Sequence, residues 1–227
     1  GALDAVNRTL QRMGHPIVEA LPDPGPTRAK VGTGALFSPD LRSTTLLLTV
    51  AYFAHIMTFY FILKWVPKIV VDMGFSPALA GSVLVWANVG GMLGAFLLSI
   101  LTLRLNVRAL VLGALVASSL MVTVFGVGQE TLAGLSLVVG IAGFCTNSAI
   151  VGMFALIARS FPPRVRGGGT GFVLGMGRGG AALGPVLAGL LFEAGQGLLV
   201  VAIVMAAGSL IAAGALSMLR PPSEALT

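Results

Sequence analysis

Residues 167–192 read GGGTGFVLGMGRGGAALGPVLAGLLF, and this stretch contains a single charged side chain, Arg178, near its middle. A segment this long and this apolar is typical of a helix that spans a membrane. An arginine at the centre of such a helix costs about 2.5–3.5 kcal/mol on insertion scales, so it needs a partner or a water-filled cavity. The simplest partner is an anion that binds and leaves again, which predicts a carboxylate ligand for Arg178.

The composition of the whole chain indicates an integral membrane protein. Of its 227 residues, 56% are hydrophobic and only 10% are charged, and the mean hydropathy is +0.96. An ordinary soluble domain carries about 25% charged residues, so that class is excluded. Five further segments contain long runs without Asp, Glu, Lys or Arg, each sufficient to cross a bilayer. The expected spans lie near residues 44–71, 77–103, 107–128, 131–158, 167–192 and 197–219.

The order of the spans predicts the architecture. Six spans divide into two groups of three, and the second group enters the membrane from the side opposite to the first. Inverted three-helix repeats of this kind build one half of several transporter folds. We therefore predict an all-α integral membrane bundle of two inverted repeats. Residues 1–42 would form a cytoplasmic loop with a short amphipathic helix, residues 43–220 the bundle, and residues 221–227 a cytoplasmic tail.

Basic residues gather at one end of the predicted spans. Those at this end are Arg8, Arg12, Arg28, Lys30, Arg42, Arg104, Arg108, Arg159, Arg164, Arg166 and Arg220. The opposite end has only Lys64 and Lys68, together with three acids. Cytoplasmic loops carry the excess of Lys and Arg, so we expect a multi-pass protein of the inner (plasma) membrane with both termini cytoplasmic. The net charge of +6 then indicates contact with anionic lipid rather than with nucleic acid.

The sequence has no signature of an enzyme. It contains no nucleotide-binding loop, no His-Glu-x-x-His motif and no pair of carboxylates at a catalytic spacing. Its acids all lie in the predicted linker, loops or tail. The single cysteine, Cys145, excludes a disulfide framework and a multi-cysteine metal site. We expect neither catalysis nor a bound cofactor or metal.

Several motifs carry a family resemblance. The run Phe161-Pro162-x-x-x-Arg166-x-x-Gly169 precedes Gly171-x-x-x-Gly175-x-Gly177-Arg178-x-Gly180-x-x-x-Gly184-Pro185. Tyr60-Phe-Ile-Leu-Lys-Trp65-Val-Pro67 ends the first span, Asn88-Val-Gly-Gly91-x-x-Gly94 lies in the second, and Asn7-Arg-Thr-Leu10 with Gly14 comes before the spans. Together they resemble the central loop and helices seven to twelve of the major facilitator superfamily. They are most similar to its aromatic acid:proton symporter family, the 4-hydroxybenzoate and benzoate carriers.

The resemblance implies that this chain is the C-terminal half of a twelve-helix facilitator. Such a protein takes up an aromatic carboxylate with protons by rocking two halves around a central site. The missing N-terminal half would supply the other wall of that site and the acidic motif associated with proton coupling. In the loop after the second span, Leu103 stands where the family has an aspartate, while Arg104 and Arg108 remain. These two and Arg166 are the candidates for gating at the cytoplasmic loops.

Five polar residues inside the spans are the candidates for binding substrate. The guanidinium of Arg178 matches a carboxylate in shape and stays charged, although it would equally suit a structural pairing with backbone carbonyls or an acid of the missing half. His55 shares a helix face with Tyr52, and it would either relay protons or bond between helices. Asn88 and Asn147 would either orient a ring hydroxyl or bridge two helices.

Two other functions stay open at this point. A facilitator of another class, such as a drug efflux pump or a sugar carrier, would give Arg178 a structural partner. A non-transporting membrane module would associate through its glycine-rich faces or act as a receptor. Competition by benzoate-type acids separates the first alternative from an aromatic acid carrier. Binding of a solute without its movement would favour the second.

Overall fold

The computed structural model describes residues 2–21 and 33–219, and every regular element within them is helical. The chain forms two compact units, Gly1–Gly32 and Thr33–Thr227. The elements are α1 (Ala2–Arg12), η1 (Thr33–Phe37), α2 (Arg42–Asp72), α3 (Pro77–Leu101), α4 (Val107–Gly126), α5 (Leu132–Ser160), α6 (Arg166–Glu193) and α7 (Leu198–Ser217). The all-α prediction is confirmed; the predicted tail, residues 221–227, lies outside the described residues.

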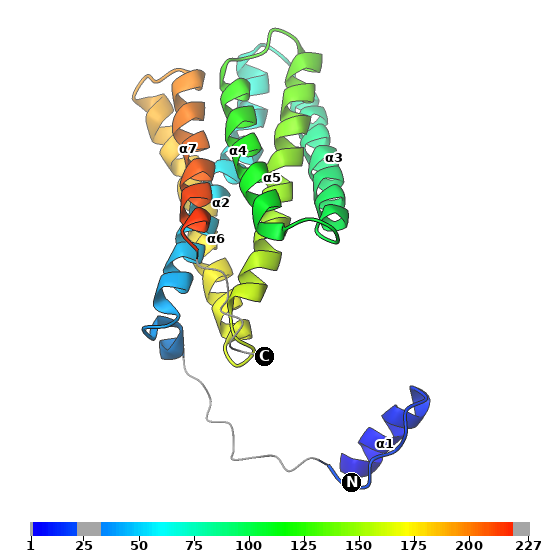
Figure 1. Cartoon of the computed structure of the whole chain (residues 1–227). Coiled ribbons are helices and arrows are strands. Elements are labelled where there is room, and N and C mark those ends of the chain that lie inside the picture. The colour runs from blue at the N-terminus through cyan, green and yellow to red at the C-terminus, as the bar shows by residue number, and fades with distance from the viewer. Residues whose placement is uncertain (1, 22–32, 220–227) are drawn as a thin grey trace. The chain divides into compact units, whose positions relative to one another are not determined.

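The helices from α2 to α7 are each long and apolar enough to cross a membrane. Their ends agree with the six predicted spans to within two residues. Three of the turns that join them contain a glycine with left-handed backbone: Gly74, Gly128 and Gly195, with φ of 86°, 85° and 79°. Glycine adopts this conformation without steric cost, so it is suited to ending a helix. All three turns lie at the same end of the bundle, the upper end in Figure 1.

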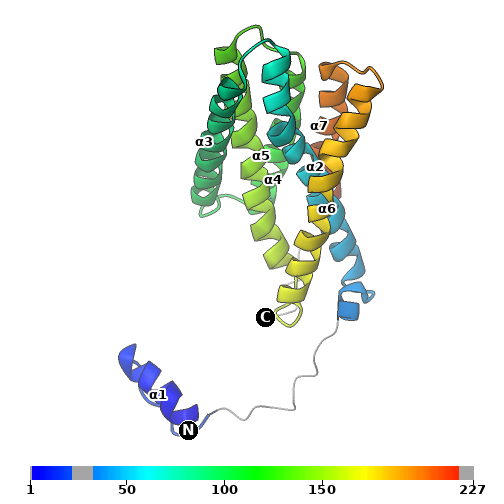
Figure 2. The ribbon, with the colours of Figure 1, turned by 180° about the vertical axis from the view of Figure 1, so that it is seen from behind.

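The six helices form two three-helix groups with the same internal arrangement. In one group α3 and α4 pack on α5, and in the other α6 and α7 pack on α2. Figures 1 and 2 show the groups side by side, and α4 and α7 pack on each other where the groups meet. The two repeats are α2–α4 and α5–α7. If each helix of one repeat is replaced by the corresponding helix of the other, the contacts of one packing group become those of the second. Because α2 and α5 cross in opposite directions, these pairings agree with the predicted inverted repeats.

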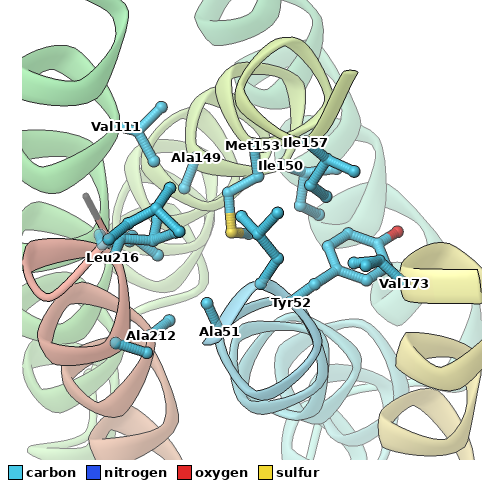
Figure 3. Packing of buried hydrophobic residues seen from close by; sticks show 14 of the residues in the cluster. Ala51, Tyr52, Val111, Ala149, Ile150, Met153, Ile157, Val173, Ala212 and Leu216 are labelled. Carbon is cyan, nitrogen blue, oxygen red and sulfur yellow. The ribbon is translucent and has the colours of Figure 1, made fainter. Parts of the chain in front are cut away.

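Two apolar clusters form the core, one toward each end of the bundle. Buried members of the cluster nearer the start of α2 include Leu48, Val111, Ile157 and Leu216. Figure 3 shows part of this cluster, where side chains of α2, α4, α5 and α7 converge. Buried members of the cluster toward the other end include Phe61, Val83, Phe125 and Met205. Buried polar side chains lie in the middle turns of the spans where the two clusters approach each other.

Glycines allow α3 and α6 to approach their neighbours closely. A Cβ added at Gly90 or Gly94 would lie within 3.0 Å of a backbone oxygen of α5. A Cβ added at Gly180 or Gly184 would lie equally close to a backbone oxygen of α2. Small residues at i and i+4 permit such contact between membrane helices. The same device therefore attaches the second helix of each repeat to the first helix of the other repeat.

The segment before α2 packs onto the bundle. Leu36 is buried, and its carbonyl accepts a hydrogen bond of 2.8 Å from the Thr45 hydroxyl. The ring of Phe37 meets that of Phe172 edge-on, with 5.4 Å between centroids. These contacts join the segment to the second compact unit, which begins at Thr33. The predicted boundary at residue 42, between a cytoplasmic loop and the membrane bundle, stays a prediction.

The first unit contains the short amphipathic helix that the sequence predicted, α1. The Asn7 side chain bonds the backbone of Val18 in both directions, since its Nδ2 donates to the carbonyl and its Oδ1 accepts from the N–H, each at 2.9 Å. This pair folds the chain after α1 back along the helix.

Candidate functional site

Arg178 lies near the middle of α6, between two glycines that face α2. A Cβ added at Gly177 would overlap the ring of Tyr52, and one added at Gly179 would lie 3.1 Å from the ring of Phe53. The Tyr52 ring would not fit against α6 if position 177 carried a side chain, and a side chain at position 179 would require the Phe53 ring to shift by a few tenths of an ångström. The sequence Gly-Arg-Gly thus places a guanidinium on a helix segment that lies directly against two aromatic rings.

The Arg178 side chain is exposed on the six-helix unit. Within residues 2–21 and 33–219 it makes no hydrogen bond and no ion pair. Its charge is close enough to the Tyr52 phenol to act on it electrostatically. Since a charge at mid-span requires compensation, the partner of Arg178 has to come from outside the described helices, as an anion or as a group of another part of the protein.

Tyr52 is the predicted site residue that lies closest to Arg178. It is 5% exposed, and its ring lies 5.9 Å from that of Phe154 of α5, tilted by 46°. Figure 3 shows this ring between α2 and Val173 of α6. Tyr52 and Phe154 therefore form an aromatic contact one helix away from the guanidinium.

His55 lies inside the bundle and not on the surface that carries Arg178. It is completely buried. Its Nδ1 lies 2.9 Å from the Ser209 hydroxyl of α7, and its Nε2 lies 3.1 Å from the Thr146 carbonyl of α5. Both ring nitrogens are thus occupied by protein groups. A direct contact between His55 and a substrate stays a prediction, and this arrangement gives no support to it.

Asn147 lies at the contact between α3 and α5, whereas Asn88 is exposed on α3, and both are away from the α2–α6 contact that holds Arg178. Asn147 fills the space beside Gly91, one turn along α3 from Asn88. Each side chain donates from Nδ2 to a carbonyl one turn earlier on its own helix, at 2.8 Å for Asn88 and 3.1 Å for Asn147. The amide oxygens accept no hydrogen bond from the described residues. They are free to accept one from a ligand hydroxyl.

The three arginines predicted to act at the cytoplasmic loops have different surroundings. Arg108 donates from Nη2 to the carbonyl of Ser217 at 2.6 Å, which caps the end of α7. Arg166 donates from Nε to the carbonyl of Phe161 at 3.3 Å, within the loop between α5 and α6. Arg104 is exposed and has no partner among the described residues. Two of the three therefore hold loops and helix ends in this conformation; a gating role stays a prediction for all three.

Sequence reasoning missed the residues around these candidates. Phe53, Phe154, Ser118 and Ser209 were not singled out from the sequence. The two serines are completely buried and hydrogen-bonded to each other at 3.2 Å. One signal in the sequence could have indicated the two serines. Several different spans each have a polar residue in a middle turn, and polar side chains at that depth need hydrogen-bond partners.

Comparison with known proteins agrees with the fold and the motifs. The family model described as Major Facilitator Superfamily matches residues 48–227. The chain is 30% identical over 179 residues to a 3-(3-hydroxy-phenyl)propionate transporter of Escherichia coli, covering 78% of this chain and 44% of the relative. It is 29% identical to a benzoate transport protein of Acinetobacter baylyi (73% and 35%) and 30% identical to a gallate transporter of Pseudomonas putida (76% and 38%).

The chain spans less than half the length of each of these relatives. Their names confirm the resemblance to aromatic acid carriers. With a family model that matches most of the chain and six helices able to span a membrane, the chain is a multi-pass membrane protein that belongs to the Major Facilitator Superfamily.

Proposed function

We propose that the full-length protein is a secondary transporter that takes up an aromatic carboxylate together with protons. These six helices would form its C-terminal half, and a second six-helix half would complete the central site. The relatives support this assignment, since each is named as a transporter of an aromatic acid. The inverted pairing of the helices supports alternating access, in which two halves rock about a site near the middle of the membrane.

The observation that carries the proposal is the exposed, unpaired guanidinium of Arg178 at mid-span. A carboxylate accepts two parallel hydrogen bonds from a guanidinium, and this pair is stronger in a site with little water than at an open surface. Among the described residues, no acid lies in the middle turns of a span, so none competes for Arg178. A substrate carboxylate would therefore supply the counter-ion that Arg178 lacks among the described residues.

The surroundings of Arg178 suit an aromatic acid. Tyr52 and Phe53 lie against the glycines on either side of it, and Phe154 extends the aromatic surface toward α5. Tyr52 is buried, so the rings open to a ligand are the exposed Phe154 and the half-buried Phe53. Aromatic rings prefer tilted or offset contact with other rings, so these two can hold the ring of a ligand whose carboxylate is on Arg178. Asn88 and Asn147 stay candidates for a ring hydroxyl, since their amide oxygens accept no hydrogen bond from the described residues.

The orientation follows from the charges at the two ends of the bundle. The end at which α2 begins carries Arg42 and the arginines of the α3–α4 and α5–α6 loops. These two loops lie at the lower ends of the helices that they join in Figure 1. We infer that this end faces the cytoplasm and that the protein lies in the inner membrane with both termini cytoplasmic. Uptake would then run from the end with the glycine turns toward the end with the arginines.

Uptake of labelled 4-hydroxybenzoate by cells that express the full-length protein tests the proposal. We expect Arg178→Ala to lower uptake by about 10- to 100-fold, the loss expected for charge-assisted hydrogen bonds worth about 1.5–3 kcal/mol. A protonophore should abolish accumulation by the wild type. Arg164→Ala is the matched control, because Arg164 is exposed in the α5–α6 loop and has no partner among the described residues. Wild type that is well expressed yet moves no aromatic acid would redirect the search to efflux or sugar transport.

A further inference from the structure

A layer of buried polar side chains crosses the bundle between its two apolar clusters. It consists of His55, Ser118, Thr146 and Ser209, from α2, α4, α5 and α7, and none of them is more than 2% exposed. On α4, α5 and α7 the polar residue falls between members of one apolar cluster and members of the other, and on α2 His55 lies one residue before Ile56, the last buried member of the first cluster on that helix. We call this set the mid-span polar layer. α3 and α6 contribute nothing to it and attach through their glycines instead.

The hydrogen bonds of the layer have a fixed direction. A carbonyl only accepts, so the Nε2 of His55, 3.1 Å from the Thr146 oxygen, carries the proton. In a neutral ring the Nδ1 then accepts, and the Ser209 hydroxyl donates to it at 2.9 Å. Because Ser209 donates its only hydroxyl proton to His55, its oxygen acts as the acceptor in the bond with the Ser118 hydroxyl, which donates at 3.2 Å. The chain of donors therefore runs from Ser118 through Ser209 and His55 to Thr146.

This arrangement satisfies His55 as an uncharged ring. No described acid faces it, because the acids of the described spans lie at helix ends. The other titratable or charged groups in the middle turns of α2, α5 and α6 are Tyr52 and Tyr60 on the helix of His55, Cys145 beside Thr146 on α5, and Arg178 on α6, and α3 has none. α7 has no titratable residue, and α4 has only Arg108 at its cytoplasmic end. A proton added to His55 would therefore create a buried charge without a counter-ion.

The layer also sets the rotation of α2. Thr58, one turn after His55 and likewise completely buried, donates to the Met205 carbonyl of α7 at 2.6 Å. Two polar anchors one turn apart thus hold one side of α2 against α7. Tyr52 lies three residues before His55, at an angle of about 60° around the helix. While the anchors hold, Tyr52 is directed toward Gly177 and the Arg178 turn of α6.

We propose that His55 is a positioning residue, which links four helices as a neutral donor and acceptor, holds Tyr52 beside Arg178, and does not carry the transported proton. The last part rests on the proposed transport function. The first part concerns the bundle alone.

The experiment compares two substitutions in the full-length protein. Gln at position 55 offers an N–H donor and a carbonyl acceptor but never titrates, whereas Leu fills a similar volume without either. We expect His55→Gln to unfold within about 2 °C of the wild type and His55→Leu to unfold at least about 5 °C lower, because the latter leaves buried partners unsatisfied. His55→Leu unfolding together with the wild type would overturn the positioning role.

Transport by the same variants tests whether His55 carries the transported proton. Proton-driven accumulation and substrate exchange are measured from pH 5 to 8, with 4-hydroxybenzoate as the probe. We expect His55→Gln to keep both rates within about threefold of the wild type and to keep the same pH profile. A stable His55→Gln protein that exchanges substrate but fails to accumulate it would overturn the proposal, since His55 would then carry the proton. If the wild type moves no aromatic acid, the proposed function fails while the unfolding data still decide the positioning role.

Discussion

The contact between α7 and α2 gives a sharp test of the packing at the centre of the bundle. A Cβ added at Gly208 would lie 2.6 Å from the Thr58 hydroxyl and closer still to the carbonyl oxygen of Ala54. Ordinary contact of a carbon begins near 3.4 Å and the Ala54 oxygen would lie about 1 Å inside that limit, so Gly208→Ala has to move α7 away from α2 by about 1 Å. The neighbouring Ser209 would be drawn away from His55 by the same movement.

The magnitude follows from comparison with a second glycine of the same helix. Gly214 has nothing within 4 Å of its added Cβ. Both substitutions gain the helix propensity of alanine, worth about 0.8–1 kcal/mol in a helix interior, and only Gly208→Ala incurs overpacking of about 1–3 kcal/mol. We therefore expect the free energy of unfolding of Gly208→Ala to lie about 1–3 kcal/mol below that of Gly214→Ala.

Unfolding of the full-length protein by SDS in mixed micelles, followed by the loss of helical circular dichroism, measures this difference. Wild type and both variants are compared at the same lipid and detergent composition. Equal stability of Gly208→Ala and Gly214→Ala would refute the close approach of α7 to α2, and with it the geometry of the mid-span polar layer.

Three further predictions use the same unfolding assay. Arg108→Gln should lower the free energy of unfolding by about 0.5–1.5 kcal/mol, because the charged donor at the Ser217 carbonyl is lost from a bond that is exposed to solvent; no change would show that the cap is not formed in the membrane. Trp65→Phe keeps a ring beside Phe192 but removes the 3.2 Å bond to the Pro185 carbonyl, so a loss of about 0.5–1.5 kcal/mol is expected, and a loss above about 3 kcal/mol would mean that packing is also disturbed. Lys68→Ala breaks an exposed ion pair with Asp72 and should change stability by less than about 1 kcal/mol, so a larger loss would contradict the exposure of that pair.

The sequence was sufficient to locate the spans because each depends on local information. Apolar runs give the length, and the ends carry their own signals. Pro77 follows Ser76 at the start of α3, and the Asn106 side chain accepts from the N–H groups of Arg108 and Ala109 at the start of α4. These signals lie within a few residues of the feature that they determine, so no tertiary structure is needed to read them.

The surroundings of the candidate residues could not be read in the same way. His55 was recognisable as a polar residue at mid-span, but its partner Ser209 lies 154 positions later in the chain. Arg108 was predicted to act in gating, yet it donates to the backbone carbonyl of Ser217. Every residue has such a carbonyl, so the sequence does not mark this one as the acceptor. Whether a polar side chain faces the bundle or a cavity depends on the rotation of each helix about its axis. That rotation is set by contacts between distant segments.

Arg178 stands between these two cases. Its unusual position in an apolar run was evident from the sequence, and the structure places it on the surface of the six-helix unit. The sequence did not show that the rings of Tyr52 and Phe53 pack against Gly177 and Gly179. Glycines in a membrane helix take part in many kinds of close packing. The pairing of a guanidinium with an aromatic surface emerged only once α6 was placed against α2.

The most direct test of the account is whether Arg178 recognises the carboxylate of the ligand. Equilibrium binding of 4-hydroxybenzoate and of its uncharged amide is measured on the purified full-length protein, for the wild type and for Arg178→Ala. We predict that the wild type prefers the acid by at least about tenfold, as expected for one charge-assisted interaction of about 1.5 kcal/mol, and that Arg178→Ala binds the two compounds about equally. A variant that keeps the preference for the acid, or that loses affinity for acid and amide alike, would contradict the assignment of Arg178 to the carboxylate.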